Sequence, residues 1–350
     1  MMRVAINGYG RIGRIAHRVI LEKYSDTIEV VAINAGSSTD IKGWAYLLKY
    51  DTAYGPLQNE VSTYGNSAST QKDLIGYLVI DQKQVPVFSQ KDPTQLPWKE
   101  FNVDVVIEST GHFQKEEMLL SHLSSGAKAV VLSAPAKDME IPTYVISVNQ
   151  QDYHGEKAIS NASCTTNCIT PVAKVIDEYF GIEKAMMTTI HAYTSDQKLE
   201  DGGHKDYRRA RAAAQNIVPT TTGATEAAIR TMPHLKDKFS GLSIRVPVVV
   251  GSLSDFTFLL KKETIAADIN EAFKTEAKKP EYQGILMVTQ DPLVSSDIIK
   301  NSHSAIVDLS LTQVVGGTLA KVIAWYDNEW GYGNRLVEET LLVGKNLTQS

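Results

Sequence analysis

The fold of the first part of this chain is decided by seven residues near its N-terminus, Asn7-Gly8-Tyr9-Gly10-Arg11-Ile12-Gly13. They form a G-x-G-x-x-G pattern between a strand-like run, residues 3–7, and a helix-like stretch, residues 12–23. Glycines at this spacing permit a tight turn and let the backbone approach a pyrophosphate, which the helix N-terminus stabilises. The position after the first strand favours a dinucleotide site; a purely structural glycine turn is the alternative.

Behind this motif, short β-branched runs alternate with helix-like stretches as far as residue 150. This alternation predicts a parallel sheet with crossover helices. A stretch rich in Ser, Thr and Gly, residues 61–69, is expected in a surface hairpin. The predicted strands are residues 3–7, 28–34, 103–108 and 129–133.

After residue 164 several strand candidates follow one another without a helix between them, which predicts antiparallel pairing. Two amphipathic helices are expected here, at residues 223–231 and 264–278, and a final helix at 334–343 is expected to pack back on the first domain. The predicted strands are residues 185–191, 244–250, 255–260, 285–290, 304–312 and 320–326.

Composition narrows the functional classes. The length of 350 residues suggests about two domains. A net charge of −5 gives no support to a primary role in nucleic-acid binding. The absence of a run of about 18 apolar residues predicts no membrane span. Only two cysteines, four residues apart, cannot form a disulfide framework, so we expect reduced thiols and a cytoplasmic location without a secretory signal.

The two cysteines lie in the stretch Ser160-Asn161-Ala162-Ser163-Cys164-Thr165-Thr166-Asn167-Cys168. This stretch places Cys164 where a turn of small residues meets a predicted helix. Unpaired N–H groups and the positive end of the helix dipole favour a thiolate there, so Cys164 is the candidate nucleophile. The alternative, a buried small hydrophobic residue, is the interpretation we give to Cys168, one helical turn further on.

The second predicted strand lacks an expected feature. An acidic residue should end it and bind the adenosine ribose, but the chain continues with Ala35-Gly36-Ser37-Ser38. Loss of this charge removes repulsion against a 2′-phosphate, and Ser37 or Ser38 is able to hydrogen-bond one. This favours NADP; the alternatives are that Asp40 reaches back, or that NAD is bound less selectively.

Taken together, these motifs resemble the phosphorylating glyceraldehyde-3-phosphate dehydrogenase family. The resemblance implies an α/β Rossmann domain with a mostly parallel sheet, residues 1–163 completed by the C-terminal helix 334–350. It also implies an α+β catalytic domain with a largely antiparallel sheet, residues 164–333, an S-loop at about 192–222, and a homotetramer. The matching segments are residues 7–14, 47–51, 108–111, 160–168, 191–197, 208–223, 245–247 and 325–332.

The activity implied by the resemblance is the reversible phosphorylating oxidation of D-glyceraldehyde 3-phosphate to 1,3-bisphosphoglycerate with NAD or NADP. Cys164 would attack the aldehyde to give a thiohemiacetal, and the oxidised product would remain on it as a thioester until inorganic phosphate attacks. His191, one of eight histidines, would act as the base, because a neutral imidazole can accept the protons involved.

The resemblance also assigns binding residues. For the substrate's phosphate it implies Thr194, Asp196 and Arg245, and for the attacking phosphate Ser163, Thr165, Thr222 and Gly223. The cluster Arg208-Arg209-Ala210-Arg211 is interpreted as an interface or loop anchor. No metal is expected. The cofactor residues implied are Gly8, Gly10, Arg11, Ile12, Gly13, Ala35, Ser37, Lys91, Ser109, Thr110, Gly111, Ser133, Asn328 and Tyr332.

Some positions depart from the family's pattern. Ala35 stands where NAD-specific members tend to carry an acid, and Gly202-Gly203 replace a Leu-Pro pair, so NADP or dual use is favoured. Val248-Val249 replace the usual Thr-Pro beside Arg245. Two alternatives remain open: erythrose-4-phosphate dehydrogenase, and a non-catalytic binding or surface-interaction protein that keeps only the fold. The physiological direction, glycolytic or gluconeogenic, is not set by these residues.

Overall fold

The computed structural model describes residues 1–65 and 73–347, and these fall into two compact units. The first unit comprises Met1–Tyr144, Asp152–Ala162 and Gly333–Ser350, and the second comprises Val145–Gln151 and Ser163–Tyr332. The short segment Val145–Gln151, which the sequence gave no reason to separate from its neighbours, is thus grouped with the second unit.

The first unit is built on an eight-stranded sheet in the order β3-β4-β5-β2-β1-β6-β7-β8. From β5 to β8 in this order, all neighbouring strands pair in parallel. The pairs β3–β4 and β4–β5 are antiparallel. The strands are β1 (Met2–Asn7), β2 (Ile28–Asn34), β3 (Val61–Tyr64), β4 (Leu74–Ile80), β5 (Lys83–Phe88), β6 (Val105–Glu108), β7 (Ala129–Leu132) and β8 (Ala158–Ser160).

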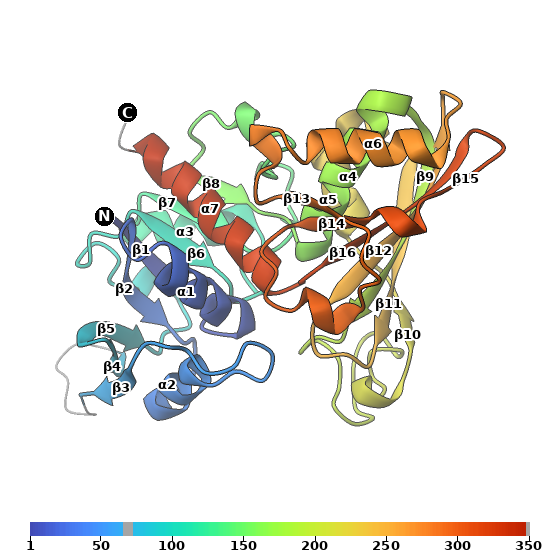
Figure 1. The fold of residues 1–350 in the computed structure, drawn as a ribbon. Helices are drawn as coiled ribbons and strands as arrows, with labels where there is room; N and C mark the ends of the chain where they lie inside the picture. Colours follow the sequence, from blue (N-terminus) through green and yellow to red (C-terminus); the bar gives the residue numbers. More distant parts are fainter. Residues whose placement is uncertain (66–72, 348–350) are drawn as a thin grey trace. The chain divides into compact units, whose positions relative to one another are not determined.

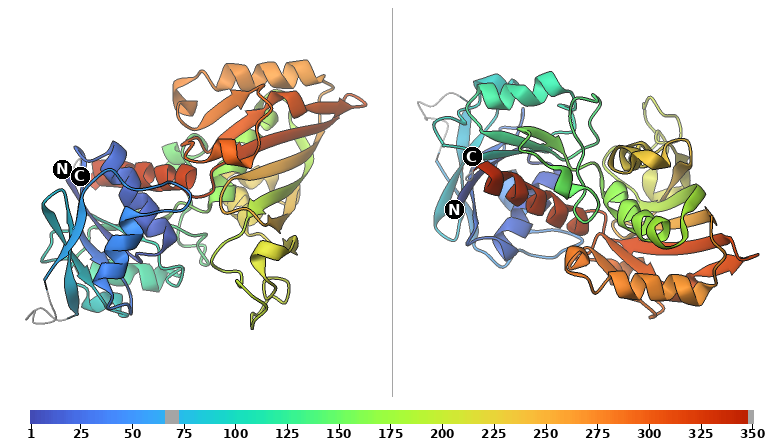
Figure 2. Two further views of the ribbon diagram at one scale, coloured as in Figure 1. Left: turned by 60° about the horizontal axis from the view of Figure 1, so that its bottom comes forward. Right: turned by 90° about the horizontal axis from the view of Figure 1, so that it is seen from above.

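Helices cover both faces of this sheet, as expected for central parallel strands whose residues are nearly all apolar and buried. Figure 2 shows α3 (Glu116–Ser124) and α7 (Trp330–Leu347) on opposite faces. The last helix lies beside α1 (Arg11–Lys23), and Lys23 Nζ donates to Asn334 Oδ1 at 2.7 Å (Figure 1). The C-terminal helix therefore packs on the first unit, as the sequence predicted.

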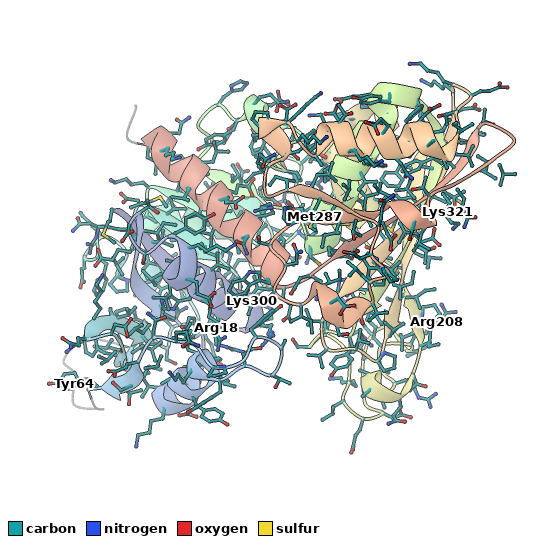
Figure 3. The ribbon with its side chains drawn as sticks, viewed as in Figure 1. Arg18, Tyr64, Arg208, Met287, Lys300 and Lys321 are labelled. Carbon is teal, nitrogen blue, oxygen red and sulfur yellow. The ribbon has the colours of Figure 1, made fainter. Side chains whose placement is uncertain are left out.

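Helix α2 (Ile41–Lys49) is anchored through its C-terminal carbonyls. Arg18, labelled in Figure 3, reaches from α1 and donates to the carbonyl oxygens of Leu48 and Lys49 at 2.7 and 3.1 Å. This arginine is almost fully buried, so it satisfies carbonyls that would otherwise lack partners at the helix end. Of the expected hairpin at 61–69, residues 61–64 form β3, which pairs with β4, and residues 66–69 lie outside the described chain.

The order of the central strands places a topological switch in the first unit. The chain runs from β1 to β2 on one side and later to β6 on the other. The carboxyl ends of these three strands therefore meet at one edge of the sheet, at Asn7, Asn34 and Glu108. In open α/β sheets this is where ligands bind.

The second unit has a sheet in the order β10-β11-β9-β12-β16-β14-β13, with β15 paired to β16. Two pairs, β11–β9 and β13–β14, are parallel and the others are antiparallel. The strands are β9 (Ile182–Ala192), β10 (Val218–Thr220), β11 (Phe239–Val246), β12 (Ser252–Leu260), β13 (Leu286–Thr289), β14 (Ala305–Asp308), β15 (Gln313–Val315) and β16 (Leu319–Tyr326).

Alternating burial along β12 shows that one face of this sheet is covered. The covering helices are α4 (Cys164–Phe180), α5 (Ala224–Thr231) and α6 (Ala266–Glu276), which appear against the sheet in Figure 2. The core between them includes Val172 and Ile176 of α4 and Phe256 and Phe258 of β12. This sheet positions the end of β9 beside the start of α4.

Two predicted strands have different bounds in the structure. The strand expected at 244–250 is β11, which ends at Val246 because Pro247 has no N–H for the ladder. The strand expected at 304–312 ends at Asp308, where the carboxylate accepts from Ser310 N at 3.2 Å and starts a 3₁₀ turn. Among the described residues, no helix combines the length and apolarity needed to span a membrane.

Candidate active site

The candidate nucleophile and base lie together in the second unit. Cys164 is the first residue of α4, and His191 is the second-last residue of β9. Cys164 Sγ lies 3.4 Å from His191 Nε2, within the range for a thiol–imidazole hydrogen bond. Ser163 begins the helix as its N-cap, since its hydroxyl accepts from Thr166 N at 3.1 Å. The cap fixes where α4 begins and therefore where the Cys164 side chain starts.

The surroundings of His191 keep its imidazole neutral. Burial, together with the nearby Arg245 guanidinium, lowers the pKa of His191 to about 3. The ring packs edge-on against Tyr326, with centroids 6.0 Å apart. A neutral imidazole is the form that can accept a proton, so the ring is in the form that a general base requires, although its lowered pKa makes it a weak base.

The second ring nitrogen of His191 determines whether Nε2 can act as that base. His191 Nδ1 lies 2.7 Å from Ala192 O, which only accepts, and 2.6 Å from Arg245 Nη1, which only donates. A proton on Nδ1 would pair it with the carbonyl and leave Nε2 free to accept the thiol proton, whereas the contact with Arg245 favours an unprotonated Nδ1. Arg245 Nη1 also lies 3.2 Å from Ala192 O, so it can donate to the same carbonyl.

Opposing influences act on the pKa of the Cys164 thiol. Burial raises the pKa of Cys164, while Arg245 and hydrogen bonds from the Thr165 hydroxyl and from backbone N–H groups lower it. The N–H groups at the helix N-terminus therefore act in the predicted direction, but desolvation is the largest effect and the pKa lies above its usual value. Attack by the protonated thiol requires transfer of its proton to Nε2.

Thr165 has a different partner from the one predicted. Its hydroxyl hydrogen-bonds Tyr326 OH at 2.9 Å, and that phenol also meets Thr189 Oγ1 at 2.8 Å. Thr165 Oγ1 remains 3.9 Å from Cys164 Sγ. Its side chain therefore packs beneath the sulfur. The hydroxyl has one donor and two acceptor sites, so the hydrogen bond to Tyr326 does not exclude the predicted contact with phosphate.

The starts of α4 and α5 come close together on the same unit. Thr166 Oγ1 lies 3.4 Å from Ala224 O, and Thr222 Oγ1 accepts from Ala224 N at 3.2 Å. Ser163, Thr222 and Gly223 therefore stand at two neighbouring helix N-termini, where N–H groups and dipoles favour an anion. This arrangement agrees with the predicted place of a phosphate.

The dinucleotide motif lines a pocket within the first unit. Gly8 and Gly10 form part of its wall, beside Ala35, Ser37 and Lys91, and its cavity volume is about 500 Å³. Gly8 has φ +94°, and a Cβ there would lie 2.5 Å from Thr110 N, so only glycine fits. No side chain caps the start of α1 at Gly10, where a Cβ would meet nothing within 4 Å. The open helix N-terminus fits a pyrophosphate.

Comparison with known proteins identifies the family of both parts of the chain. Residues 2–116 match the model described as glyceraldehyde 3-phosphate dehydrogenase, NAD binding domain, and residues 163–328 match the one described as its C-terminal domain. The chain belongs to the glyceraldehyde-3-phosphate dehydrogenase family. The family's first domain contains the glycine-rich pocket described above, and a nicotinamide cofactor fits the residues that line it.

Similar proteins cover nearly the whole chain. Glyceraldehyde-3-phosphate dehydrogenase 2 of Streptomyces avermitilis is 50% identical over 348 residues, 99% of each chain. Glyceraldehyde-3-phosphate dehydrogenase 2 of Bacillus subtilis is 47% identical over 96% of this chain and 95% of its own. The chloroplastic glyceraldehyde-3-phosphate dehydrogenase A of Chlamydomonas reinhardtii is 46% identical, covering 96% and 87%.

Not all the expected cofactor residues line the pocket. Arg11 pairs with Asp51, donating from Nη2 to Oδ1 at 3.1 Å, and a Cβ on Gly13 would lie 2.2 Å from Gly8 O, so Gly13 serves close packing. Ile12, Gly111 and Ser133 are also absent from the described pocket wall. Asn328 and Tyr332 belong to the second unit, where Asn328 Oδ1 accepts from Ser252 Oγ at 2.9 Å.

Arg209 lies in the same loop as Thr194 and Asp196, which were predicted to bind phosphate. Its guanidinium joins Asp196, Thr220 Oγ1 at 2.9 Å and Thr221 O at 3.1 Å. Asp196, which the resemblance assigned to the substrate phosphate, therefore holds an arginine, a role that suits a carboxylate better than contact with an anion. The three arginines in four residues were the sequence signal, and two of them form ion pairs within this loop: Arg209 with Asp196 and Arg211 with Asp201.

Proposed function

We propose that this protein catalyses the reversible phosphorylating oxidation of D-glyceraldehyde 3-phosphate to 1,3-bisphosphoglycerate, with NADP or NAD as the acceptor. The observation that carries the proposal is the contact of 3.4 Å between Cys164 Sγ and His191 Nε2, with Arg245 beside the imidazole. A nucleophile, a neutral base and a cation for an anionic substrate are thus present in one unit. A nucleophilic thiol must stay reduced, which suits the cytoplasm.

The first half of the reaction uses the thiol and the imidazole. His191 Nε2 takes the proton of Cys164 as Sγ bonds to the aldehyde carbon, and it returns that proton to the oxygen, giving a thiohemiacetal. The nicotinamide, when bound, accepts the hydride released from that carbon. His191 takes the hydroxyl proton at this stage, and a thioester to Cys164 remains.

In the second half a phosphate oxygen attacks the thioester carbon and the C–S bond breaks. The sulfur leaves as a thiolate and recovers a proton from His191, which restores the neutral pair. Ser163, Thr222 and Gly223 would hold the attacking phosphate at the two helix N-termini. Arg245 and Thr194 would bind the substrate's own phosphate, and Arg209 would add charge through the loop that Asp196 fixes.

A comparison of substrates tests this function. We expect the purified enzyme to turn over the three-carbon sugar phosphate in the presence of inorganic phosphate and to lose that activity when phosphate is omitted. The four-carbon erythrose 4-phosphate should be the poorer substrate, because Thr194 and Asp196, which the sister family generally lacks, are both present. A higher kcat/KM for the four-carbon sugar would overturn the assignment.

We propose that the cofactor is NADP or that both cofactors are used. The described residues lining the pocket include no Asp or Glu. Asp40, the acid that was expected to reach back, instead caps α2, accepting from Gly43 N at 2.8 Å. Ser38 Oγ accepts from Trp44 Nε1 at 3.0 Å, so its own hydrogen is available for an acceptor such as a phosphate oxygen.

Ala35→Asp should shift the enzyme towards NAD. An aspartate at the end of β2 would accept from the ribose hydroxyls of NAD and repel a 2′-phosphate. We expect the ratio of kcat/KM for NADP to that for NAD to fall by about tenfold or more, which corresponds to about 1.4 kcal/mol. Steady-state kinetics with both cofactors give this ratio. A hundredfold preference for NAD in the unaltered enzyme would contradict the proposal.

We also propose a homotetramer. The segment 192–222 exposes large apolar side chains, Leu199 at 83%, Tyr207 at 86% and Ile217 at 70%. Such side chains on one loop are typical of a surface that a second subunit covers. Sedimentation equilibrium of the purified protein tests this, and a mass of about 38.5 kDa would contradict it.

A further inference from the structure

A fully buried carboxylate lies at the edge of the sheet where the dinucleotide pocket opens. Glu108 ends β6 and has no exposed surface. Its Oε1 accepts from the Thr110 backbone N at 2.7 Å and also from the Thr110 hydroxyl. Its Oε2 accepts from Asn7 Nδ2 and from His122 Nε2, the latter at 3.1 Å. Sequence patterns assigned no role to Glu108, although it is the first residue of the matching segment 108–111, which contains Ser109 and Thr110.

At one end of this hydrogen-bond network, the contacts of His122 determine which of its ring nitrogens carries the hydrogen. Trp98 Nε1 lies 3.0 Å from His122 Nδ1, and an indole N–H only donates. His122 Nδ1 is therefore the acceptor, and the hydrogen of the neutral ring is on Nε2, directed at Glu108. Both aromatic side chains are fully buried, so this direction is held by packing as well as by the hydrogen bonds.

The other end is fixed by backbone groups of Gln90. Asn34 Oδ1 accepts from Gln90 N at 3.0 Å, and Asn34 Nδ2 donates to Gln90 O at 2.8 Å. Because a backbone N–H and C=O cannot exchange roles, the Asn34 amide has one orientation. Asn34 Nδ2 also donates to Asn7 Oδ1 at 2.7 Å, which leaves Asn7 Nδ2 to face Glu108.

Hydrogen-bond donors of the network therefore face both carboxylate oxygens of Glu108. Donors from Asn7 and His122 meet one oxygen, and the Thr110 N–H meets the other. The Thr110 hydroxyl can donate or accept, but the other three neighbours direct hydrogens at the two oxygens, which suits a carboxylate acceptor. A buried charge with this many donors is stabilised by them, and removal of the charge leaves the donors unpaired.

We propose that Glu108 is a positioning residue for the nicotinamide cofactor. It holds the two walls of the cofactor pocket in a fixed position relative to each other. Thr110 and Ser109 line one wall, and Asn34 and Gln90 line the other. The carboxylate binds the first wall directly and the second through Asn7 and Asn34. This inference rests on the cofactor-binding part of the proposed function, not on the sugar substrate.

Glu108→Gln tests the proposal with almost no change of shape. The new amide NH₂ faces a donor whichever way it points, so one wall must move. We expect the dissociation constants of both NAD and NADP, measured by calorimetric titration without sugar phosphate, to rise about tenfold. The KM for the cofactor should rise in parallel, while kcat at saturating cofactor stays within about twofold, since Cys164 and His191 are untouched.

Glu339→Gln is the matched control. Glu339 is also fully buried in the first unit, on α7, but it is not part of the described pocket wall. Burial raises the pKa of this carboxyl well above its usual range, so a neutral amide is a close substitute. We expect this variant to bind both cofactors as the unaltered enzyme does.

Three results would overturn the proposal: folded Glu108→Gln protein with full cofactor affinity, a loss of kcat rather than affinity, or an equal loss of affinity in both glutamine variants. If Glu108→Gln fails to fold, His122→Phe, which removes the donor to Oε2 and also the acceptor of Trp98 Nε1, should still raise both dissociation constants about threefold. An unchanged value overturns the proposal. If the protein does not oxidise the sugar phosphate, the proposed function is refuted. The comparison of cofactor dissociation constants still tests the role of Glu108 in that case.

Discussion

Replacing Cys164 with serine is expected to lower kcat for acyl-phosphate formation by about four orders of magnitude. The serine hydroxyl has a far higher pKa than a thiol, and His191, whose own pKa is lowered to about 3, is too weak a base to activate it. The alcohol would also form an ester, which phosphate attacks less readily than a thioester. Stopped-flow measurement of reduced cofactor formation would separate a failed first turnover from a slow release.

The second cysteine provides the control for this experiment. Cys168 lies one turn further along α4, is fully buried and packs in the core of the second unit. Burial strongly raises the pKa of its thiol, so it is a poor nucleophile. Cys168→Ala should retain most of the activity and lose some thermal stability. If Cys164→Ser kept more than a tenth of the original kcat, the covalent route would be wrong.

Replacing His191 with asparagine is expected to lower kcat/KM by about 10²–10⁴-fold near neutral pH and to change the shape of the pH profile. In the unaltered enzyme the imidazole is unprotonated above a pH of about 3 and the raised pKa of Cys164 keeps the thiol protonated. Proton transfer within the pair should therefore make the rate nearly independent of pH between about pH 5 and pH 8.

The asparagine variant lacks a base, so only the thiolate formed by solvent can attack. Because the thiol pKa lies above this range, the thiolate fraction and the rate should rise about tenfold per pH unit. Alkylation of Cys164 by iodoacetamide gives the same comparison without substrate. Parallel pH profiles in the two proteins would show that His191 does not take the proton, whatever the loss of activity.

The sequence predicted many elements because their signals are local. The glycine pattern after residues 3–7 requires a turn and an open helix N-terminus wherever the strand lies, and the structure has both at Gly8 and Gly10. Ser163 and the small residues before it predicted that a helix begins at Cys164. Where the prediction was wrong, as for the ends of β11 and β14, a side chain or a proline acted against the apolar pattern.

The sequence alone therefore indicated the two kinds of sheet, the family and the candidates that we propose as nucleophile and base, since periodicity and motif spacing are properties of the chain itself. Only the tertiary structure decided the protonation of that pair, because desolvation and the charge of Arg245 depend on which residues surround the sulfur and the ring. The same holds for Arg209, which meets Asp196 thirteen residues away, and for Glu108, whose partners come from β1 and α3. Contacts between distant segments arise from folding, and no local pattern encodes them.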